Sequence, residues 1–291
     1  MATEASALDE IRQLVDHIYN KPETARNICW KIYRFFVYAP HTQEQSLAND
    51  SNIIAEMANT FVANGYKIQP VIEDLLRSQH FYEAGGDVKD DNFGGIVKSP
   101  LDVVTGTMRF FSIPLPDMVS DINRFYEATG ALVRTLGDLG MNFFEPYDVA
   151  GYEAYHQFPI YHRSWITPNF LARRYAFIRT VVTASEEGMF KVDVRQFVTD
   201  YFNSVASDAR SLIIELAKYL LPVSDNLTFD EGADDTSALT AARLNYFKAR
   251  FLQEFDEAYW TQRWTQGAAD LGYQLEYLFN AMLQSPEYQL S

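Results

Sequence analysis

The sequence predicts an all-α fold, a layered multi-helix bundle with one long aromatic-rich loop and little or no β-strand. Three observations predict it. Apolar residues recur at intervals of three and four, Pro, Ser and Gly stand where helices begin and end, and long alternating strand patterns are missing from the sequence. With 47% apolar and 22% charged residues, the 291-residue chain can bury a large core, which excludes wholesale disorder.

The first expected helix covers residues 22–39. Asn20 can cap it and Pro22 suits its first turn. Apolar side chains take up most of its circumference and leave one polar stripe that carries Lys31 and Arg34. A helix of this kind is usually surrounded by others, so we place it near the centre of the helical domain.

Further helices are expected wherever a periodic apolar pattern lies between a start signal and a stop signal. They are residues 53–63, 68–77, 100–111, 116–139, 168–184, 194–205, 209–221, 237–256 and 269–283. Gly65 is expected to end the first of these and Ser99 to cap the helix that starts at Pro100. In 116–139 the apolar residues form one seam, which would face a partner helix over about 36 Å.

Three segments are loops by composition: residues 83–97, 140–167 and 224–235. The middle one is too long to be a simple connector, and loops of that length are usually functional or disordered. Because the chain has no internal repeat and no linker rich in Pro, Gly or Ser, a single domain over residues 1–291 is the simplest organisation. A subdivision near Ser185 is the second option.

Composition excludes several classes of protein. The 24 basic and 39 acidic residues give 24 − 39 = −15, which argues against nucleic acid as a partner. No apolar run approaches the ~18 residues that cross a bilayer, and the first twenty residues are too acidic for a secretory leader. A single cysteine, Cys29, permits no internal disulfide, and we predict no metal and no cofactor.

Standard catalytic motifs are missing from the sequence, which lowers the expectation of an enzyme. In the long loop, His156 and His162 lie six residues apart and near Asp148 and Glu145. These side chains suit a metal ion or proton transfer, although hydrogen bonding of both rings to loop backbone is the favoured alternative.

Cations and aromatic rings supply the other candidates. Residues 154–185 hold Arg173 and other cations but no acid, so this segment could capture an anion. Salt bridges to other helices are favoured, because the acidic remainder of the chain supplies many partners. For Lys31 and Arg34 ion pairing is likewise favoured over ligand contact. The loop rings, Tyr152 and Trp165 among them, either fill the core or form an exposed stacking surface, and core filling is favoured.

Several phrases together resemble the bacterial family known as domain of unknown function 1800. They are PETAR at 22–26, KIYRFFV at 31–37, LLRSQHF at 75–81, VKSP at 97–100, FEPYDVAGY at 144–152, SWI at 164–166, LAR at 171–173 and LQSPEYQ at 283–289. Tyr147 and Tyr152 depart from the proline and tryptophan common in that family. The resemblance implies that the chain is the C-terminal part of a typical member, without the usual N-terminal half, and that it acts outside the cytoplasm. It implies no reaction.

Two functional hypotheses follow. The first is a non-catalytic extracytoplasmic binding or assembly module, which presents the aromatic and arginine residues of its loop to a glycan, another polymer or a protein. The alternative is a hydrolase with a carboxylate and histidine site in loop 140–167, metal-assisted or not. The weak catalytic candidates are Asp148, Glu145, His156 and His162, and the binding candidates are Tyr152, Trp165, Arg173, Lys31 and Arg34.

Overall fold

The computed structural model describes residues 3–37, 51–82, 96–142, 163–183, 185–186, 188–222, 226–232 and 239–290. They fall into two compact units, one of residues up to Ile96 and one from Val97 onward. The division therefore lies at residues 96 and 97, whereas the helices on either side of Ser185 belong to the same unit.

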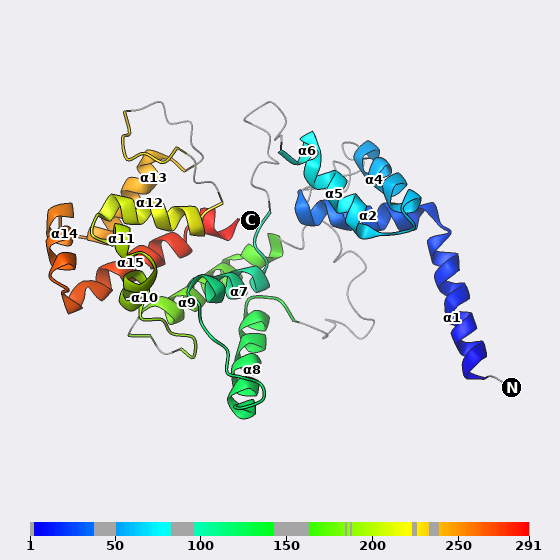
Figure 1. Ribbon diagram of the computed structural model, residues 1–291, viewed down its shortest axis with the longest axis horizontal. Helices are drawn as coiled ribbons and strands as arrows, with labels where there is room; N and C mark the ends of the chain where they lie inside the picture. The colour runs from blue at the N-terminus through cyan, green and yellow to red at the C-terminus, as the bar shows by residue number, and fades with distance from the viewer. Residues whose placement is uncertain are drawn as a thin grey trace. The chain divides into compact units, whose positions relative to one another are not determined.

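All the regular secondary structure of the described residues is helical, and they contain no β-sheet, only an isolated antiparallel bridge between Val97 and Leu290. This confirms the all-α prediction. The first unit consists of α1 (Glu4–Tyr19), α2 (Pro22–Phe36), α4 (Ser51–Ala63), α5 (Ile68–Arg77) and α6 (Gln79–Tyr82) (Figure 1). No helix of the described residues is long and apolar enough to span a bilayer.

Helix α2 is the centre of the first unit. It packs against α1, α4 and α5. Its buried side of Ala25, Cys29 and Tyr33 meets a core that includes Phe61 and Val71. Burial raises the pKa of the Cys29 thiol to about 11, so the thiol is protonated at neutral pH.

The expected polar stripe of α2 is wrong at Arg34. Lys31 is exposed, but Arg34 is only 7% exposed, while the neighbouring Phe35 is 66% exposed. The helix ends at Phe36 and not near residue 39, so Arg34 lies in its last turn. There the negative end of the helix dipole favours a cation, and the side chain is taken into the unit instead of reaching water.

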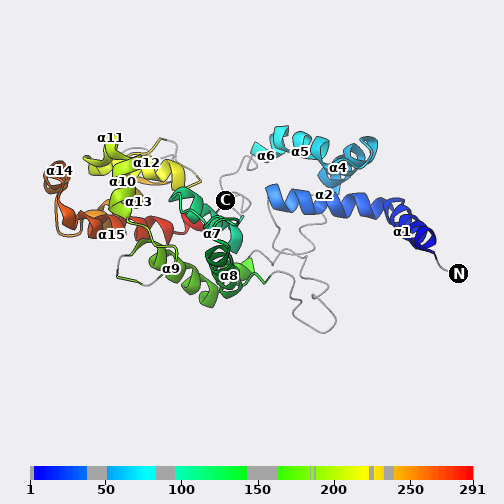
Figure 2. The same cartoon turned by 60° about the horizontal axis from the view of Figure 1, so that its bottom comes forward.

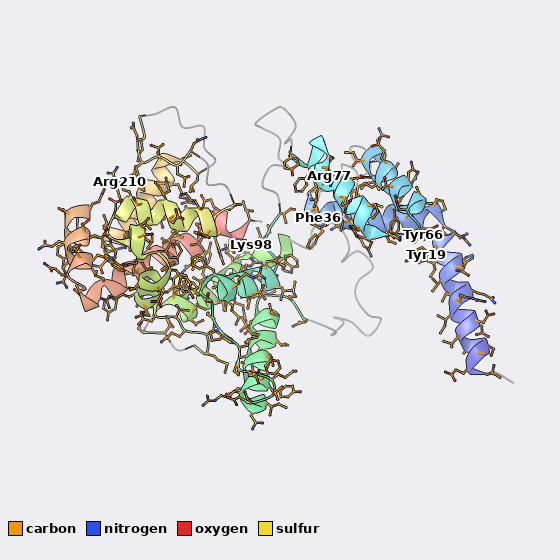
Figure 3. All side chains as sticks on the ribbon, viewed as in Figure 1. Tyr19, Phe36, Tyr66, Arg77, Lys98 and Arg210 are labelled. Carbon is orange, nitrogen blue, oxygen red and sulfur yellow. The ribbon has the colours of Figure 1, made fainter. Side chains whose placement is uncertain are left out.

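Helix α1 was not predicted from the sequence. Thr3 and Ser6 form a capping box at its start, and within this helix no residue is buried. At its end the Tyr19 ring meets Tyr66 edge to face, with the ring centroids 4.8 Å apart (Figure 3). Tyr66 also donates a hydrogen bond from its hydroxyl to the carbonyl oxygen of Tyr19 at 3.0 Å. Because Tyr66 lies in the connection between α4 and α5, the C-terminal end of α1 contacts this connection.

The second unit holds most of the helices. They are α7 (Pro100–Phe110), α8 (Ile122–Asp138), η2 (Arg163–Ile166), α9 (Pro168–Val182), α10 (Val194–Tyr201), α11 (Asn203–Ala206), α12 (Ala209–Leu220), α13 (Ala241–Leu252), α14 (Glu257–Thr265), η3 (Ala269–Leu271), α15 (Gly272–Leu283) and η4 (Glu287–Gln289). Ser99 caps α7 in a capping box with Asp102, as predicted.

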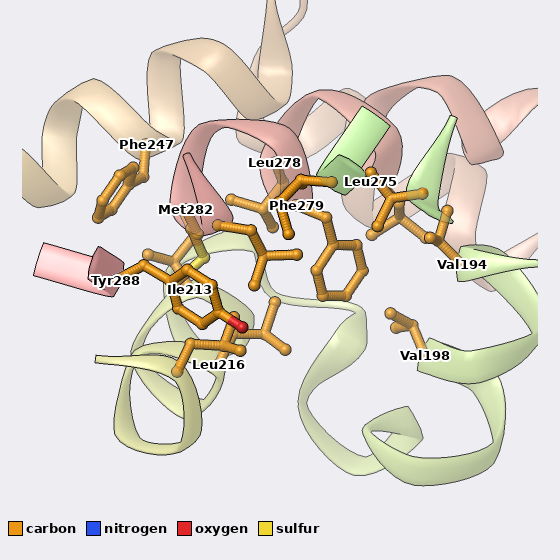
Figure 4. Close-up of a cluster of buried hydrophobic side chains, with 14 of the residues drawn as sticks. Val194, Val198, Ile213, Leu216, Phe247, Leu275, Leu278, Phe279, Met282 and Tyr288 are labelled. Atoms are coloured by element: carbon orange, nitrogen blue, oxygen red, sulfur yellow. The ribbon is translucent and has the colours of Figure 1, made fainter. Parts of the chain in front are cut away.

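Helix α15 is the central element of this unit. It packs against α9, α10, α12 and α13, which surround it in Figures 1 and 2. Leu275, Leu278, Phe279 and Met282 are fully buried on it, as Figure 4 shows. The same close-up shows Tyr288 of η4 at the edge of this core. The C-terminal segment, residues 284–290, therefore packs directly onto the central helix.

The long seam predicted over residues 116–139 is wrong in its first part. The side chain of Asp117 accepts hydrogen bonds from the backbone N–H groups of Val119 and Ser120 at 3.0 and 2.7 Å. This local turn competes with helix formation, and α8 begins only at Ile122. Ile122 is 50% exposed, whereas Leu136 is buried, so the seam meets a partner only near its C-terminal end.

Two other predicted helices are shorter than expected. The 194–205 helix divides into α10 and α11 at Phe202. The 237–256 helix is α13, which ends before Gln253, a residue with a positive φ of 54°. Helix α14 follows after it and was not predicted from the sequence.

Candidate functional site

Most of the residues proposed from the sequence lie outside the described residues. This applies to Glu145, Asp148, Tyr152, His156 and His162, so the carboxylate and histidine site stays a prediction. Among the described residues, no three His, Cys, Asp or Glu side chains lie close enough together to hold a metal ion.

The other proposed residues lie in different places. Lys31 and Arg34 are on α2 in the first unit, and Trp165 is in η2 of the second. Arg173, on α9, forms an ion pair with Asp138 of α8, with its Nη1 atom 2.6 Å from the carboxylate. Both side chains are about half exposed, and such surface pairs contribute between 0 and about 1 kcal/mol. Arg173 therefore forms a salt bridge to another helix, the role favoured for the cations of residues 154–185.

The neighbouring arginine, Arg174, is fully buried and is not among the site residues predicted from the sequence. Its guanidinium donates from Nε to the carbonyl oxygen of Trp165 at 3.1 Å and from Nη2 to that of Lys98 at 2.8 Å. Its Nη1 donates to the side-chain oxygen of Gln289 at 3.2 Å. One side chain therefore joins η2, the segment before α7, and the C-terminal segment.

A second cation lies beside it. The ammonium group of Lys98, labelled in Figure 3, sits 4.0 Å from the centre of the Tyr288 ring. The Tyr288 hydroxyl is hydrogen-bonded to Thr107 Oγ1 at 2.8 Å. Burial lowers the pKa of Lys98 to about 8, and the charge of Arg174 adds to this while Asp102 opposes it. We call the group of Lys98, Trp165, Arg174, Tyr288 and Gln289 the Arg174 node.

The node is a structural element of the second unit. Burial lowers the pKa of Arg174 to about 10, so the guanidinium stays protonated at neutral pH. All three nitrogen atoms of its guanidinium donate hydrogen bonds to neutral acceptors of the protein itself. Few donors are therefore left to bind a ligand.

An open pocket of about 280 Å³ lies between α9, α13, α15 and the start of the C-terminal segment. We call it the tyrosine–arginine pocket. The residues that line it are Tyr175, Arg243, Tyr246, Arg250, Tyr277, Asn280, Ala281, Gln284, Ser285 and Pro286. Among these lining residues there is no Asp, Glu, His or Cys.

Within each helix, the usual helical spacing places the lining side chains on one face. Arg243, Tyr246 and Arg250 are three and four residues apart, and they share one face of α13. On α15 the same spacing relates Tyr277, Asn280 and Gln284. This spacing of polar and aromatic residues is a sequence signal, but it does not say that the two faces meet.

The two arginines of the pocket differ in their partners. Arg243 donates from Nε and Nη2 to the two carboxylate oxygens of Glu287, at 2.7 and 3.1 Å. Burial raises the pKa of the Glu287 carboxyl, but the hydrogen bonds from Arg243 and its charge outweigh this, and the pKa lies below its usual value. Arg250 is exposed, and its guanidinium has no acceptor among the described residues.

The rings and amides are placed for polar contact. Tyr246 and Tyr277 are each 46% exposed, and their hydroxyls have no hydrogen-bond partner among the described residues. Gln284 donates to the side-chain oxygen of Asn280 at 2.6 Å, and Asn280 donates to Thr183 Oγ1 at 3.0 Å. The amides are therefore ordered before any ligand arrives.

A model of a family described as protein of unknown function, DUF1800, matches residues 1–290. The chain belongs to the DUF1800 family. Neither a curated protein nor a solved structure matches it. Membership confirms the resemblance drawn from the sequence phrases, and it brings no known activity to this DUF1800 chain.

Several of the phrases that carry the resemblance meet at the Arg174 node of this DUF1800 chain. VKSP supplies Lys98, SWI supplies Trp165, and the C-terminal phrase supplies Tyr288 and Gln289. That last phrase also supplies Ser285 and Pro286 to the tyrosine–arginine pocket. One short segment therefore connects the buried node with the open pocket.

A second pocket, of about 390 Å³, lies at the start of α10 and α15. Its charged side chains have partners within the DUF1800 chain. Asp193 caps α10, Arg195 donates to the carbonyl oxygen of Gly267 at 2.9 Å, and Asp270 pairs with Arg263. In the tyrosine–arginine pocket, by contrast, one arginine is exposed with no carboxylate partner among the described residues, and two tyrosine rings are nearly half exposed. It is therefore the better candidate site.

Proposed function

We propose that this DUF1800 chain is a non-catalytic binding module that acts outside the cytoplasm, and that the tyrosine–arginine pocket holds a segment of a polymer. The observation that carries the proposal is the lining itself: three tyrosines, two arginines and two amides, with no carboxylate or histidine among them. The DUF1800 resemblance supports the location.

The composition of the lining favours binding over hydrolysis. Hydrolysis of a glycosidic or ester bond needs a general acid and base or an activated nucleophile, usually from Asp, Glu or His. The described lining of the pocket offers none of these side chains. Its tyrosines offer flat apolar faces for stacking and hydroxyls that fix orientation, a combination suited to sugar rings.

The shape of the site favours a polymer over a small enclosed molecule. Tyr246 and Tyr277 are each nearly half exposed, so the pocket is open along the side that they border. An enclosed site would bury most of a small ligand. A polymer segment can instead occupy the pocket and continue beyond it.

A polysaccharide binding assay with two variants tests the proposal. We expect the chain to be retarded in gels that contain a bound polysaccharide, and to release no reducing ends from it. Tyr246→Ala should weaken the retardation strongly, because it removes one of the two exposed rings of the pocket. Tyr126→Ala on α8 is the matched control, since that tyrosine is 65% exposed and lies outside the pocket.

Two results would contradict the proposal. Panels of glycans and pull-downs of protein partners that are both empty would remove the binding function. Release of reducing ends that Tyr246→Ala leaves unchanged would indicate catalysis elsewhere in the chain. Recovery of the native protein in the cytoplasmic fraction of its cells would overturn the location alone.

A further inference from the structure

Arg250 is the cation of the pocket whose charge is not compensated by a described residue. Helix α13 carries three cations. Arg243 is paired with Glu287, and Lys248 is paired with Glu257 at 3.2 Å. Arg250 is exposed, and no carboxylate among the described residues lies within ion-pair distance of it. A cation held at a pocket wall with its donors unused is a ready partner for an anionic group.

Arg243 adds a second, directional donor to the same face. Glu287 takes its Nε and Nη2 groups, and Nη1 makes no hydrogen bond to a described residue. The carboxylate also fixes the plane of the guanidinium, so the remaining donor is held in place before a ligand binds. Arg250 lies seven positions after Arg243, or roughly 10 Å along α13.

An exposed ring stands between these two cations. Tyr246 lies one turn after Arg243 and one turn before Arg250, and the guanidinium carbon of Arg243 is 5.5 Å from its ring centroid. Tyr277 borders the pocket from α15. The order of cation, ring and cation along one helix face matches a ligand in which rings with an apolar face carry anionic groups at intervals.

The charge of the whole chain narrows the class of anion. With a formal net charge of −15, the chain repels densely charged polyanions such as nucleic acids at long range. An oligosaccharide with one carboxylate on each sugar carries less charge per length than double-stranded DNA, which has one charge per about 1.7 Å. At physiological salt, screening over about 8 Å leaves the local contact with Arg250 to decide its binding.

We infer that the tyrosine–arginine pocket binds a polysaccharide built of uronic acids, with a sugar carboxylate on Arg250, a second one near Arg243, and a sugar ring against Tyr246. This inference rests on the proposed function and names its ligand class. A planar carboxylate suits a guanidinium because both can form two parallel hydrogen bonds.

Calorimetric titration with polygalacturonate and with its fully methyl-esterified form tests the inference. The two polymers share a backbone and differ in the carboxylate charge. We expect the acid form to bind about tenfold more tightly, because a hydrogen bond between two charged groups is stronger than one to a neutral ester. Arg250→Gln should remove most of this difference, and Arg250→Lys should restore part of it.

Arg179→Gln is the matched control, since Arg179 is an exposed arginine of α9 outside the pocket. It should bind like the unsubstituted chain. Equal affinity for both forms of the polymer would overturn the inference and leave the proposed function standing. So would equally tight binding of a sulfated glycan, or an Arg250→Gln variant that keeps the preference. Failure to bind any polysaccharide or protein partner would overturn both.

Discussion

The Arg174 node and the tyrosine–arginine pocket both use the C-terminal segment, but they use arginine in opposite ways. In the node, Arg174 is fully buried and its donors end on two carbonyl oxygens and one amide oxygen. In the pocket, Arg243 keeps one free donor group and Arg250 keeps all of its side-chain donors. The comparison shows that the donors left over, more than the charge, separate a structural cation from one that can bind a ligand.

The node also supports the pocket. Arg174 fixes Gln289, and Lys98 lies on the ring of Tyr288, so both hold the segment whose first residues line the pocket. Changes in the node should therefore alter the stability of the second unit. Changes in the pocket should alter binding and leave stability nearly unchanged.

Arg174→Met should have the largest effect on stability. It removes three hydrogen bonds and leaves their acceptors buried. We expect the free energy of unfolding to fall by about 3–5 kcal/mol in urea titrations. Arg173→Met is the control on the same helix, and it should cost less than about 1 kcal/mol because its ion pair is exposed. Equal effects of the two substitutions would refute the structural role of the node.

Lys98→Met should act in the opposite direction. Burial lowers the pKa of the Lys98 ammonium group to about 8 in the folded chain, against 10.5 when unfolded. Folding therefore disfavours the charged form of this side chain. We expect the variant to be more stable by about 1–2 kcal/mol below pH 8, after the loss of the contact with Tyr288 is included.

The pH dependence of that difference gives a sharper test. Between about pH 8 and 10.5 the folded chain with Lys98 has lost a proton that its unfolded form still holds, so its stability rises relative to the variant. The advantage of Lys98→Met should therefore shrink across this window. A constant advantage, measured by thermal unfolding of both proteins in the same buffers, would show that the gain does not come from charge burial.

Glu287→Gln should have a smaller effect, a loss of about 1 kcal/mol at neutral pH. The pKa of Glu287 in the folded chain lies below its usual 4.5, so its contribution is complete above that value and is lost as the pH falls through the folded pKa. Melting temperatures of the variant and the unsubstituted chain should converge in acid. A gap that persists well below pH 4.5 would contradict the ion-pair account.

Arg250→Gln should have the smallest effect on stability, within about 0.5 kcal/mol, because the side chain is exposed and has no acceptor among the described residues. Urea unfolding checks this. A large destabilisation would mean that Arg250 has a structural role and that the distinction between node and pocket fails.

The sequence predicted the elements whose local signals agree. Helix α5 has the bounds expected for it, and Ser99 caps α7 as expected. On α15, Leu275, Leu278 and Met282 are buried as their periodicity predicts. In contrast, the turn made by Asp117 overrides the apolar seam before Ile122, since a hydrogen bond from side chain to backbone competes with helical periodicity.

The candidate site was less accessible to sequence reasoning. Arg174 stands three, four and seven residues before Phe177, Ile178 and Val181, which are all buried, so periodicity does indicate its inward face. The pocket could not be predicted in this way. Tyr175, Arg243 and Tyr277 come from three helices, and only tertiary packing brings these helices together.

The most direct measurement is a crystal structure of the chain with a galacturonate oligosaccharide. Our account predicts a sugar carboxylate within hydrogen-bond distance of the Arg250 guanidinium and a sugar ring against Tyr246, with the hydrogen bonds of Arg174 unchanged. A sugar bound at another surface while the pocket contains only water would contradict it.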